Sequence, residues 1–529
     1  MHTAIVETII SRNKFSYLML GKTSTRLLAE FALGLFLIVF LILITGCNKA
    51  DESKSKNKDT AIAPATTTVS PVAAKQTPWE LPAPPPKSAY DGPLFSLSHN
   101  YPKTSIVAPN PAPWQVAIGN KTINTQNADK YVKAVKHYIA KDMKAFLFDY
   151  PNWNPDTAQW FNQPWLSKIR DPIHGSYQGS TFPKEMFPQS GLTTAMTTHV
   201  FVYYDKVSAS SLQSVWGESG MTPVPGINAG GAQFAEGSII VKPAFTSANG
   251  DAWPPMKGAY PWKIWAVDPN SQNSAPVMQT VGLFQFDIIV KDTKSAPDTG
   301  WVFATLVYDQ RVKGDDWEKM VVLGAMWGND PTVISPQGCD YLKPKGCPVL
   351  AQTWINPAAP LYAKETLGWG GRLSGPNDAA VDITAVVQNE DGSLHPYSGR
   401  YAMSSCMACH TSAEYEMKSF LIPAPAQCTE AGDNCTPTFA KCDSAGVCKK
   451  VPPSGDADLI YYKTASPEFM RWFQNRLGNV AMDKGAVALD YDMNYAFKAL
   501  PYWSAATGVD ATPNFIESFN NYRGLKHDK

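Results

Sequence analysis

The fold is decided by two stretches, Val281-Gly-Leu-Phe-Gln-Phe-Asp-Ile-Ile-Val290 and Trp301-Val-Phe-Ala-Thr-Leu-Val-Tyr308. Both are rich in β-branched and aromatic residues, which are typical of strands. The same composition predicts strands over Thr198–Tyr204 and Ser238–Lys242. Trp, Tyr, Phe, Gly and Pro are plentiful in the whole chain, which favours strands and loops over helices. We therefore predict an α+β protein, mainly antiparallel β, with few helices.

Three segments predict helices. Asp129 to about Phe146 places apolar side chains on one stripe and lysines on the opposite face. Ser208–Trp216 is the second segment. The third begins at Ser466, which suits an N-cap and is followed by proline and glutamate, and it ends near Gly478.

The clearest chemical motif is Cys406-Met407-Ala408-Cys409-His410. This spacing is typical of c-type haem attachment, in which both sulfurs become thioethers and the histidine binds the iron. Two alternatives exist for the cysteine pair. A redox disulfide would need a strand before it and a helix after it, and a zinc site would need a second Cys/His pair. We predict one covalent haem c, with His410 as the proximal iron ligand.

The N-terminus has the pattern of a secretion signal. Basic residues precede the apolar run Phe31–Ile44, which is short for a membrane span of about 20 residues. Thr45-Gly46-Cys47 follows and resembles a bacterial lipobox, which implies cleavage and a lipid on Cys47. An uncleaved anchor is the alternative, and both place the rest of the chain outside the cytoplasm. Asn48, where an aspartate would retain a lipoprotein in the inner membrane, favours the outer membrane.

The chain has nine cysteines, and they divide by expected role. With Cys47 assigned to lipid and two others to haem, an even number remains in an oxidising compartment, which predicts disulfides. Cys339 and Cys347 bracket a short loop and are expected to pair with each other. The other four lie in a stretch poor in apolar residues, with their pairing open: Cys428, Cys435, Cys442 and Cys448. A metal knot is a weaker alternative, because they contain no Cys-x-x-Cys pair.

Four segments, in this order, resemble the cytochrome P-460 and cytochrome c′-beta family. They are Thr198–Asp205 with the helix after it, Phe234–Lys242, Asp287–Phe303, and Cys406–His410 with its tail to Phe420. The resemblance covers about residues 196–422. It implies a compact antiparallel β-sandwich with few helices. It also implies a haem with histidine on one side and an open or gated position on the other.

The resemblance implies roles for two strand residues. Lys242 matches the lysine that the P-460 branch links covalently to the porphyrin, and Asp287 falls where a carboxylate handles protons in hydroxylamine oxidation. The c′-beta branch lacks the cross-link and binds nitric oxide. From the residues alone, Lys242 could equally be an exposed strand residue and Asp287 a turn-edge residue. An unpaired carboxylate inside an apolar run would be costly if buried, which favours a functional use of Asp287.

The haem motif follows the last predicted strand only after a long insertion, and this sets the domain plan. We predict a lipoprotein signal over 1–46, a disordered tether over 47–90, a Pro- and Trp-rich N-terminal region with one helix over 91–195, a P-460-like haem domain over 196–422 with an insertion at about 310–400, a disulfide-rich loop over 423–450, and a C-terminal helical or irregular extension over 451–529.

These observations predict a lipid-anchored c-type haem protein that binds or oxidises hydroxylamine or nitric oxide at an open haem site. Whether it is a haem-dependent oxidoreductase stays open. A methionine on the iron would instead indicate an electron-transfer cytochrome, with these candidates: Met403, Met417, Met470, Met482 and Met493. A third alternative is a subunit that presents its haem to a partner enzyme.

The expected partners follow from this reading. They are a small haem ligand, a redox protein and the membrane reached through the lipid, while a homodimer is left open. Lys plus Arg and Asp plus Glu number 46 each, so the balanced charge argues against nucleic acid as a partner. The remaining histidines are expected to be structural, and His199 is the first to test.

Overall fold

The computed structural model describes residues 77–508 with gaps. The gaps are 167–168, 222, 229, 269–274, 335–345, 379, 383–385, 389–393, 397–400, 416–418, 420–423, 426–433, 436–438, 443–447, 452–460, 463–464, 466 and 468. The described residues belong to one compact unit, Ala73–Lys529. The predicted signal, Cys47 and most of the tether lie outside the described residues, as do Cys339, Cys428 and Met417.

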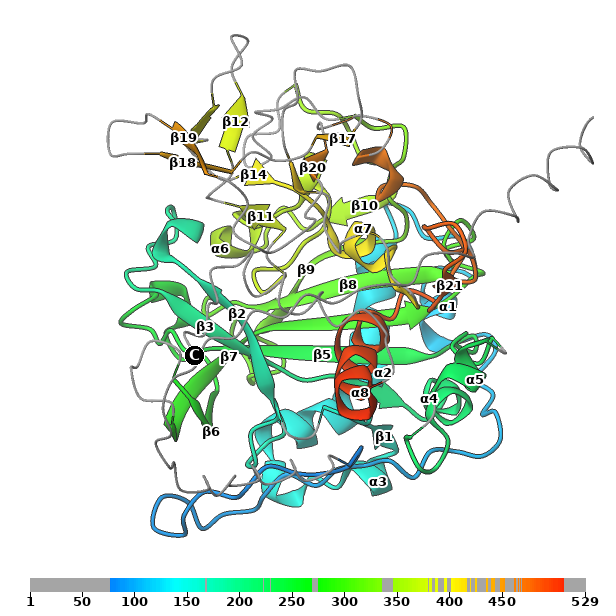
Figure 1. Cartoon of the computed structure of the whole chain (residues 1–529), viewed down its shortest axis with the longest axis vertical. Coiled ribbons are helices and arrows are strands. Elements are labelled where there is room, and N and C mark those ends of the chain that lie inside the picture. Colours follow the sequence, from blue (N-terminus) through cyan, green and yellow to red (C-terminus); the bar gives the residue numbers. More distant parts are fainter. Residues whose placement is uncertain are drawn as a thin grey trace, which may run out of the picture. The chain divides into compact units, whose positions relative to one another are not determined.

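A ten-stranded antiparallel sheet dominates the part of the chain that is described (Figure 1). Its main path is β1-β4-β5-β7-β8-β9-β10, while β2 pairs with β3, β3 with β5, and β6 with β7. The strands are β1 (Trp160–Phe161), β2 (Tyr177–Phe182), β3 (Met196–Val200), β4 (Tyr203–Asp205), β5 (Ile239–Thr246), β6 (Pro261–Val267), β7 (Pro276–Lys291), β8 (Trp301–Tyr308), β9 (Met320–Met326) and β10 (Thr353–Ile355). The predicted α+β class with a mainly antiparallel sheet is confirmed.

The strand predictions hold except for one interruption. β8 has the predicted bounds, and β7 contains the whole predicted stretch. The strand predicted over Thr198–Tyr204 is instead divided into β3 and β4. The division lies opposite Pro243, whose carbonyl accepts from Phe201 N at 3.1 Å. Because proline has no N–H to give back, the ladder of hydrogen bonds breaks there.

Helix α2 (Ala128–Phe148) confirms the predicted amphipathic helix and packs on one face of the sheet. The ring of Phe146 lies 5.1 Å from that of Tyr203, 5.4 Å from that of Phe201 and 5.3 Å from that of Trp262. The predicted N-terminal region also supplies β1 and β2 to the sheet. Residues 91–195 therefore share one hydrophobic core with the strands that follow them.

The other described helices are short. They are α1 (Pro113–Ala117), α3 (Pro155–Ala158), α4 (Ala209–Trp216), α5 (Val224–Asn228), α6 (Leu361–Lys364), α7 (Cys406–His410) and α8 (Leu500–Thr507). Single 3₁₀ turns are Tyr150–Asn152, Lys184–Met186, Pro254–Met256 and Trp369–Gly371, and a π-helical turn spans Tyr495–Ala499. Helix α4 confirms the second predicted helix. None of the described helices has the length and apolar character needed to cross a membrane.

The helix predicted from Ser466 to Gly478 is wrong. Among the described residues of this stretch, the helical structure is limited to a 3₁₀ turn, Phe469–Arg471. The carbonyl of Gln474 accepts from Asn329, and that of Gly478 accepts from Asp490 N. These two carbonyls lie at the end of the predicted helix, where carbonyls have no partner in the helical ladder. The carbonyls of Met470 and Arg471, which the ladder would use, accept instead from the side chains of Gln474 at 2.9 Å and Arg476 at 2.7 Å.

Several smaller sheets follow the main sheet in the sequence. Their strands are β11 (Val381–Asp382), β12 (Val386–Gln388), β13 (Leu394–Pro396), β14 (Tyr401–Ala402), β15 (Glu414–Tyr415), β16 (Ala424–Pro425), β17 (Asn434–Cys435), β18 (Phe439–Cys442), β19 (Cys448–Val451), β20 (Tyr461–Tyr462) and β21 (Val487–Ala488). Cys442 and Cys448 are cross-strand partners in the β18–β19 pair. Cys347 is disulfide-bonded. Its predicted partner, Cys339, lies outside the described residues, so all the disulfide pairings stay predictions.

Candidate functional site

A cavity of about 220 Å³ lies on the sheet face opposite α2. Val202 and Tyr204 line it, whereas the alternating residues Phe201 and Tyr203 pack against α2, because successive strand residues point to opposite faces. Together with the part open to solvent, the space between its walls is about 1420 Å³. Because that larger figure includes solvent, the 220 Å³ is the volume to compare with the roughly 300–1,000 Å³ of typical small-molecule sites, and it lies below that range.

Segments far apart in the sequence form this cavity. Strands β5, β7 and β8 contribute two rows of cross-strand partners, which are Ile240, Ile289 and Phe303 in one row and Lys242, Asp287 and Thr305 in the other. The remaining walls come from β2, the segment around Asn377 and Asp378, the residues 404–410, and the C-terminal residues 490–498.

Helix α7 presents the Cys-x-x-Cys-His motif to the cavity as one helical turn. Ser405 caps the helix, since its Oγ accepts from Ala408 N at 3.2 Å. Residues three and four positions apart share a helix face, and accordingly Cys406, Cys409 and His410 all line the cavity. Neither cysteine is in a disulfide. The two sulfurs and the imidazole are therefore available to a single bound group.

The orientation of His410 is fixed by a backbone carbonyl. Its Nδ1 lies 2.6 Å from the carbonyl oxygen of Tyr491, which can only accept, so Nδ1 carries the proton. Burial lowers the pKa of His410 to about 4, so the ring is neutral at pH 7. A neutral imidazole held at Nδ1 leaves its Nε2 lone pair for a metal, which is the arrangement of an axial ligand.

The thiol of Cys406 is not of the reactive type. Its Sγ donates to Asp378 Oδ2 at 3.6 Å, and burial, reinforced by Asp378 and Asp287, raises the pKa of Cys406 well above its usual range. Thioredoxin-type pairs have a lowered thiol pKa instead. No group of three or more His, Cys, Asp and Glu side chains suited to a bare metal ion occurs among the described residues. The raised thiol pKa thus does not favour a redox disulfide.

The structure brings together the two strand residues singled out in the sequence. Lys242 Nζ lies 3.1 Å from Asp287 Oδ2 and 2.7 Å from Asp378 Oδ1. Thr305 donates its hydroxyl to Asp287 Oδ1 at 2.8 Å. Because Lys242 is paired with two carboxylates and its side chain is only 25% exposed, it is not a simple solvated strand residue.

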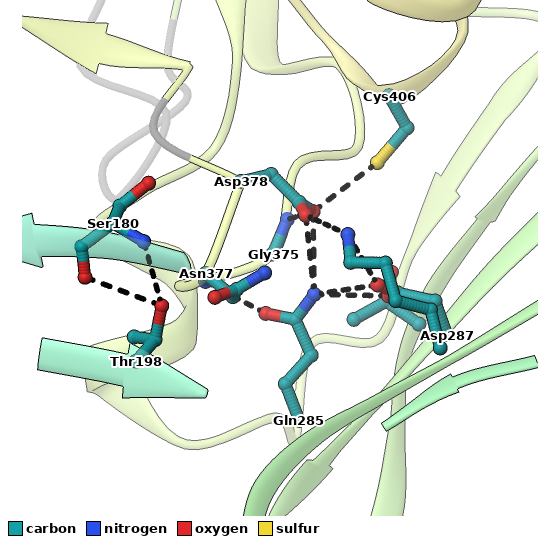
Figure 2. Close-up of polar contacts among 10 residues, drawn as sticks. Ser180, Thr198, Gln285, Asp287, Gly375, Asn377, Asp378 and Cys406 are labelled. Atoms are coloured by element: carbon teal, nitrogen blue, oxygen red, sulfur yellow. Dashed lines mark hydrogen bonds and ion pairs between the residues drawn. The ribbon is translucent and has the colours of Figure 1, made fainter. Parts of the chain in front are cut away.

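Asp378 is the residue of this cluster that the sequence analysis missed. Figure 2 shows it contacted by Cys406 and by Gln285, whose amide also reaches Asp287. It comes from the predicted insertion and accepts from Gly375 N at 2.8 Å. Its only local signal is the turn composition of Gly375-Pro-Asn-Asp378, which predicts a loop and says nothing of chemistry.

The two carboxylates differ in their affinity for a proton. Burial raises the pKa of Asp287 to about 6, and Lys242 only partly opposes this. Burial acts in the same direction on Asp378, but Lys242 and Gly375 N–H outweigh it and hold the pKa of Asp378 below its usual range. Burial opposes charge on Lys242 as well, yet the carboxylates raise its pKa well above the ordinary value. Asp287 is therefore the group that can exchange a proton near neutral pH.

The methionines predicted as possible iron ligands lie in different parts of the structure. Met493 lines the cavity, whereas Met470 and Met482 belong to a separate apolar cluster beside α7. Met403 is buried in the main core and is not among the cavity-lining residues. His199 is buried with no hydrogen-bond partner for Nε2, and it also does not line the cavity.

Comparisons of the chain with protein-family models, with curated proteins and with solved structures each gave no match. The chemistry assigned to this cavity therefore depends on the residues that line it.

Proposed function

We propose that this chain is a c-type haem protein, with the haem joined to Cys406 and Cys409 and its iron bound by His410. One observation carries the proposal: two thiols and a neutral imidazole, oriented through Nδ1 by Tyr491, line the same cavity. When bound, the haem would supply electron transfer and binding of small ligands at its iron.

Asp287 would act as the proton acceptor for a substrate oxidised in this cavity. Each electron removed from hydroxylamine is accompanied by a proton, and a carboxyl with a pKa of about 6 can take that proton near neutral pH. Asp378 would stay ionised and anchor Lys242. This supports binding or oxidation of hydroxylamine or nitric oxide, with the electrons passed to a redox partner protein.

Lys242 would serve as a charged group between the carboxylates. A covalent bond between its amine and the porphyrin needs the neutral amine, which the raised pKa of Lys242 disfavours. The cross-link implied by the family resemblance stays a prediction. Intact mass and the ferrous spectrum of Lys242→Ala test it, because loss of a cross-link would change both.

Electron transfer with His/Met ligation is the second candidate function. Met493 favours it, because this methionine lines the cavity two residues after Tyr491. A low-spin ferric spectrum that becomes high-spin in Met493→Leu would support this function over ligand binding. The third alternative, a haem-bearing partner subunit, has no separate support among the described residues.

The proposal also includes a fold and a location in the cell. We favour a P-460-like β-sandwich, supported by the antiparallel sheet, the few helices and the cavity on one sheet face. The lipid on Cys47 would hold the protein at the periplasmic face, more readily at the outer membrane. Mass spectrometry of the mature N-terminus tests the lipid directly.

Intact mass after expression with a haem-attachment system tests the proposed function. The wild type should gain the mass of one haem, and Cys406→Ser/Cys409→Ser should gain none. A Cys339→Ser/Cys347→Ser variant is the control, because it removes the same number of cysteines outside the motif. A wild type without covalent haem would refute the proposal. With haem present, a ferrous spectrum that nitric oxide leaves unchanged would contradict an open site.

A further inference from the structure

Two consecutive residues, Asp490 and Tyr491, adopt left-handed backbone conformations with φ of 48° and 66°. Aspartate adopts this conformation more readily than most residues, but a bulky aromatic residue such as Tyr491 is rarely found there. Such a conformation persists only where the surrounding structure holds it in place. Two such residues in succession must therefore be held by contacts with the rest of the structure, and their conformation determines where their backbone groups point.

The consequence is the position of one carbonyl group. The oxygen of Tyr491 lies 2.6 Å from His410 Nδ1, across 81 residues of sequence. The Tyr491 hydroxyl donates to the carbonyl of Arg476 at 2.7 Å, which anchors the other end of this residue. The ring of Phe303 contacts both partners, with its centroid 4.8 Å from His410 and 6.2 Å from Tyr491.

The cause is the buried carboxylate of Asp490. Its Oδ1 accepts from Trp301 Nε1 at 2.7 Å and from Lys291 Nζ at 2.6 Å, and its Oδ2 accepts from Phe234 N at 2.8 Å. The side chain has no exposed surface. Asp490 thus fastens the turn to the adjacent strands β7 and β8, and it does so with charge-assisted hydrogen bonds.

Gly478 leaves the space that the carboxylate occupies. A Cβ built on Gly478 would lie 1.5 Å from Asp490 Oδ1, so any larger residue would displace the carboxylate. The carbonyl of Gly478 accepts from Asp490 N at 3.1 Å. Gly478 therefore leaves room for the carboxylate of Asp490 and also holds its backbone N–H.

We infer that Asp490 and Tyr491 are positioning residues that orient His410 and strengthen its donor power toward the iron. This rests on the proposed haem. A firm hydrogen bond from Nδ1–H to a carbonyl fixes the ring and raises the basicity of Nε2. The turn would therefore strengthen the iron–histidine bond and lower the reduction potential of the haem.

The test uses the haem-loaded protein and two variants of the turn's anchor. Asp490→Asn keeps the size of the side chain but removes its charge, and Trp301→Phe removes one donor to it. Asp292→Asn is the matched control: Asp292 is also buried and accepts from an indole, Trp114 Nε1, at 3.1 Å, and it does not line the cavity.

The readouts are the iron–histidine stretching frequency of the ferrous haem and its midpoint potential. Both anchor variants should lower the frequency and raise the potential, while the control keeps the values of the wild type. If methionine fills the sixth position, the potential alone is read. Unchanged values in both anchor variants, or an equal shift in the control, would overturn the inference. Absence of haem from the wild type would instead overturn the proposed function.

Discussion

Replacement of Asp287 by asparagine should alter how stability depends on pH. Burial raises the pKa of Asp287 to about 6 from the ordinary 3.8. Between these values the folded state keeps a proton that the unfolded chain has released. The free energy of unfolding of the wild type therefore decreases as pH rises from about 4 to about 6, and it stays lower above that range.

The size of this effect follows from the pKa difference. The step from 3.8 to about 6 corresponds to about 3 kcal/mol, at about 1.36 kcal/mol per pH unit. The side chain is only 8% exposed, so solvent screening reduces the effect little. Asparagine cannot ionise. The stability of Asp287→Asn relative to the wild type should therefore rise by about 3 kcal/mol between about pH 4 and pH 7.

Urea unfolding followed by tryptophan fluorescence at a series of pH values measures this difference. Asp309→Asn is the control, because Arg311 holds the pKa of Asp309 below its usual range and Asp309 lies outside the Asp287 cluster. Its ionised form stabilises the folded state above the unfolded pKa, and this is lost as pH falls through the folded pKa. The Asp309→Asn deficit should thus be constant near neutral pH. A wild-type and Asp287→Asn difference that is independent of pH would refute the reasoning.

Three further predictions concern the α2 side of the sheet. Phe146→Ala should lower the free energy of unfolding by about 3–5 kcal/mol, because its ring packs against five others. Tyr138→Ala, at a side chain that is 44% exposed, should have much less effect in the same denaturation assay. Tyr131→Phe removes a 2.8 Å hydrogen bond to Asp292 and should cost about 1.5–3 kcal/mol by urea unfolding. Burial lowers the pKa of His174 to about 3, so the unfolded chain binds a proton that the fold excludes and stability falls as pH drops from about 6.5 to 3. His174→Gln should therefore move the acid-unfolding midpoint to lower pH, and an unchanged midpoint would contradict this.

The sequence predicts those elements whose signal is local. The apolar stripe of α2 and the β-branched residues of β7 and β8 each lie within a single stretch of sequence, and all three elements form as predicted. The helix expected near Phe469 fails where the side chains of Gln474 and Arg476 bind the carbonyls of Met470 and Arg471, which a helical ladder would use. The break between β3 and β4 depends on a proline in another strand, which no local pattern reveals.

The residues of the candidate site also differ in whether a local sequence pattern predicts them. Cys406, Cys409 and His410 are contiguous, so their spacing alone brings them to one cavity. Asp378 reaches Lys242 across 136 positions, and Tyr491 reaches His410 across 81. Neither carries a motif, because an ordinary turn residue and a backbone carbonyl have no sequence pattern of their own. Their roles follow only from strand register and tertiary packing.

The position of Tyr491 in the chain has a consequence for maturation. In the proposed export of the chain from its N-terminus, the motif of α7 leaves the cytoplasm before residues 490–498, which complete the cavity wall. Both thiols are therefore presented while the cavity is still incomplete on that side. Chemistry on the sulfurs can therefore precede the step that fixes the His410 ring. A chain truncated before Asp490 should still be modified at its cysteines, while His410 lacks the hydrogen bond to the Tyr491 carbonyl.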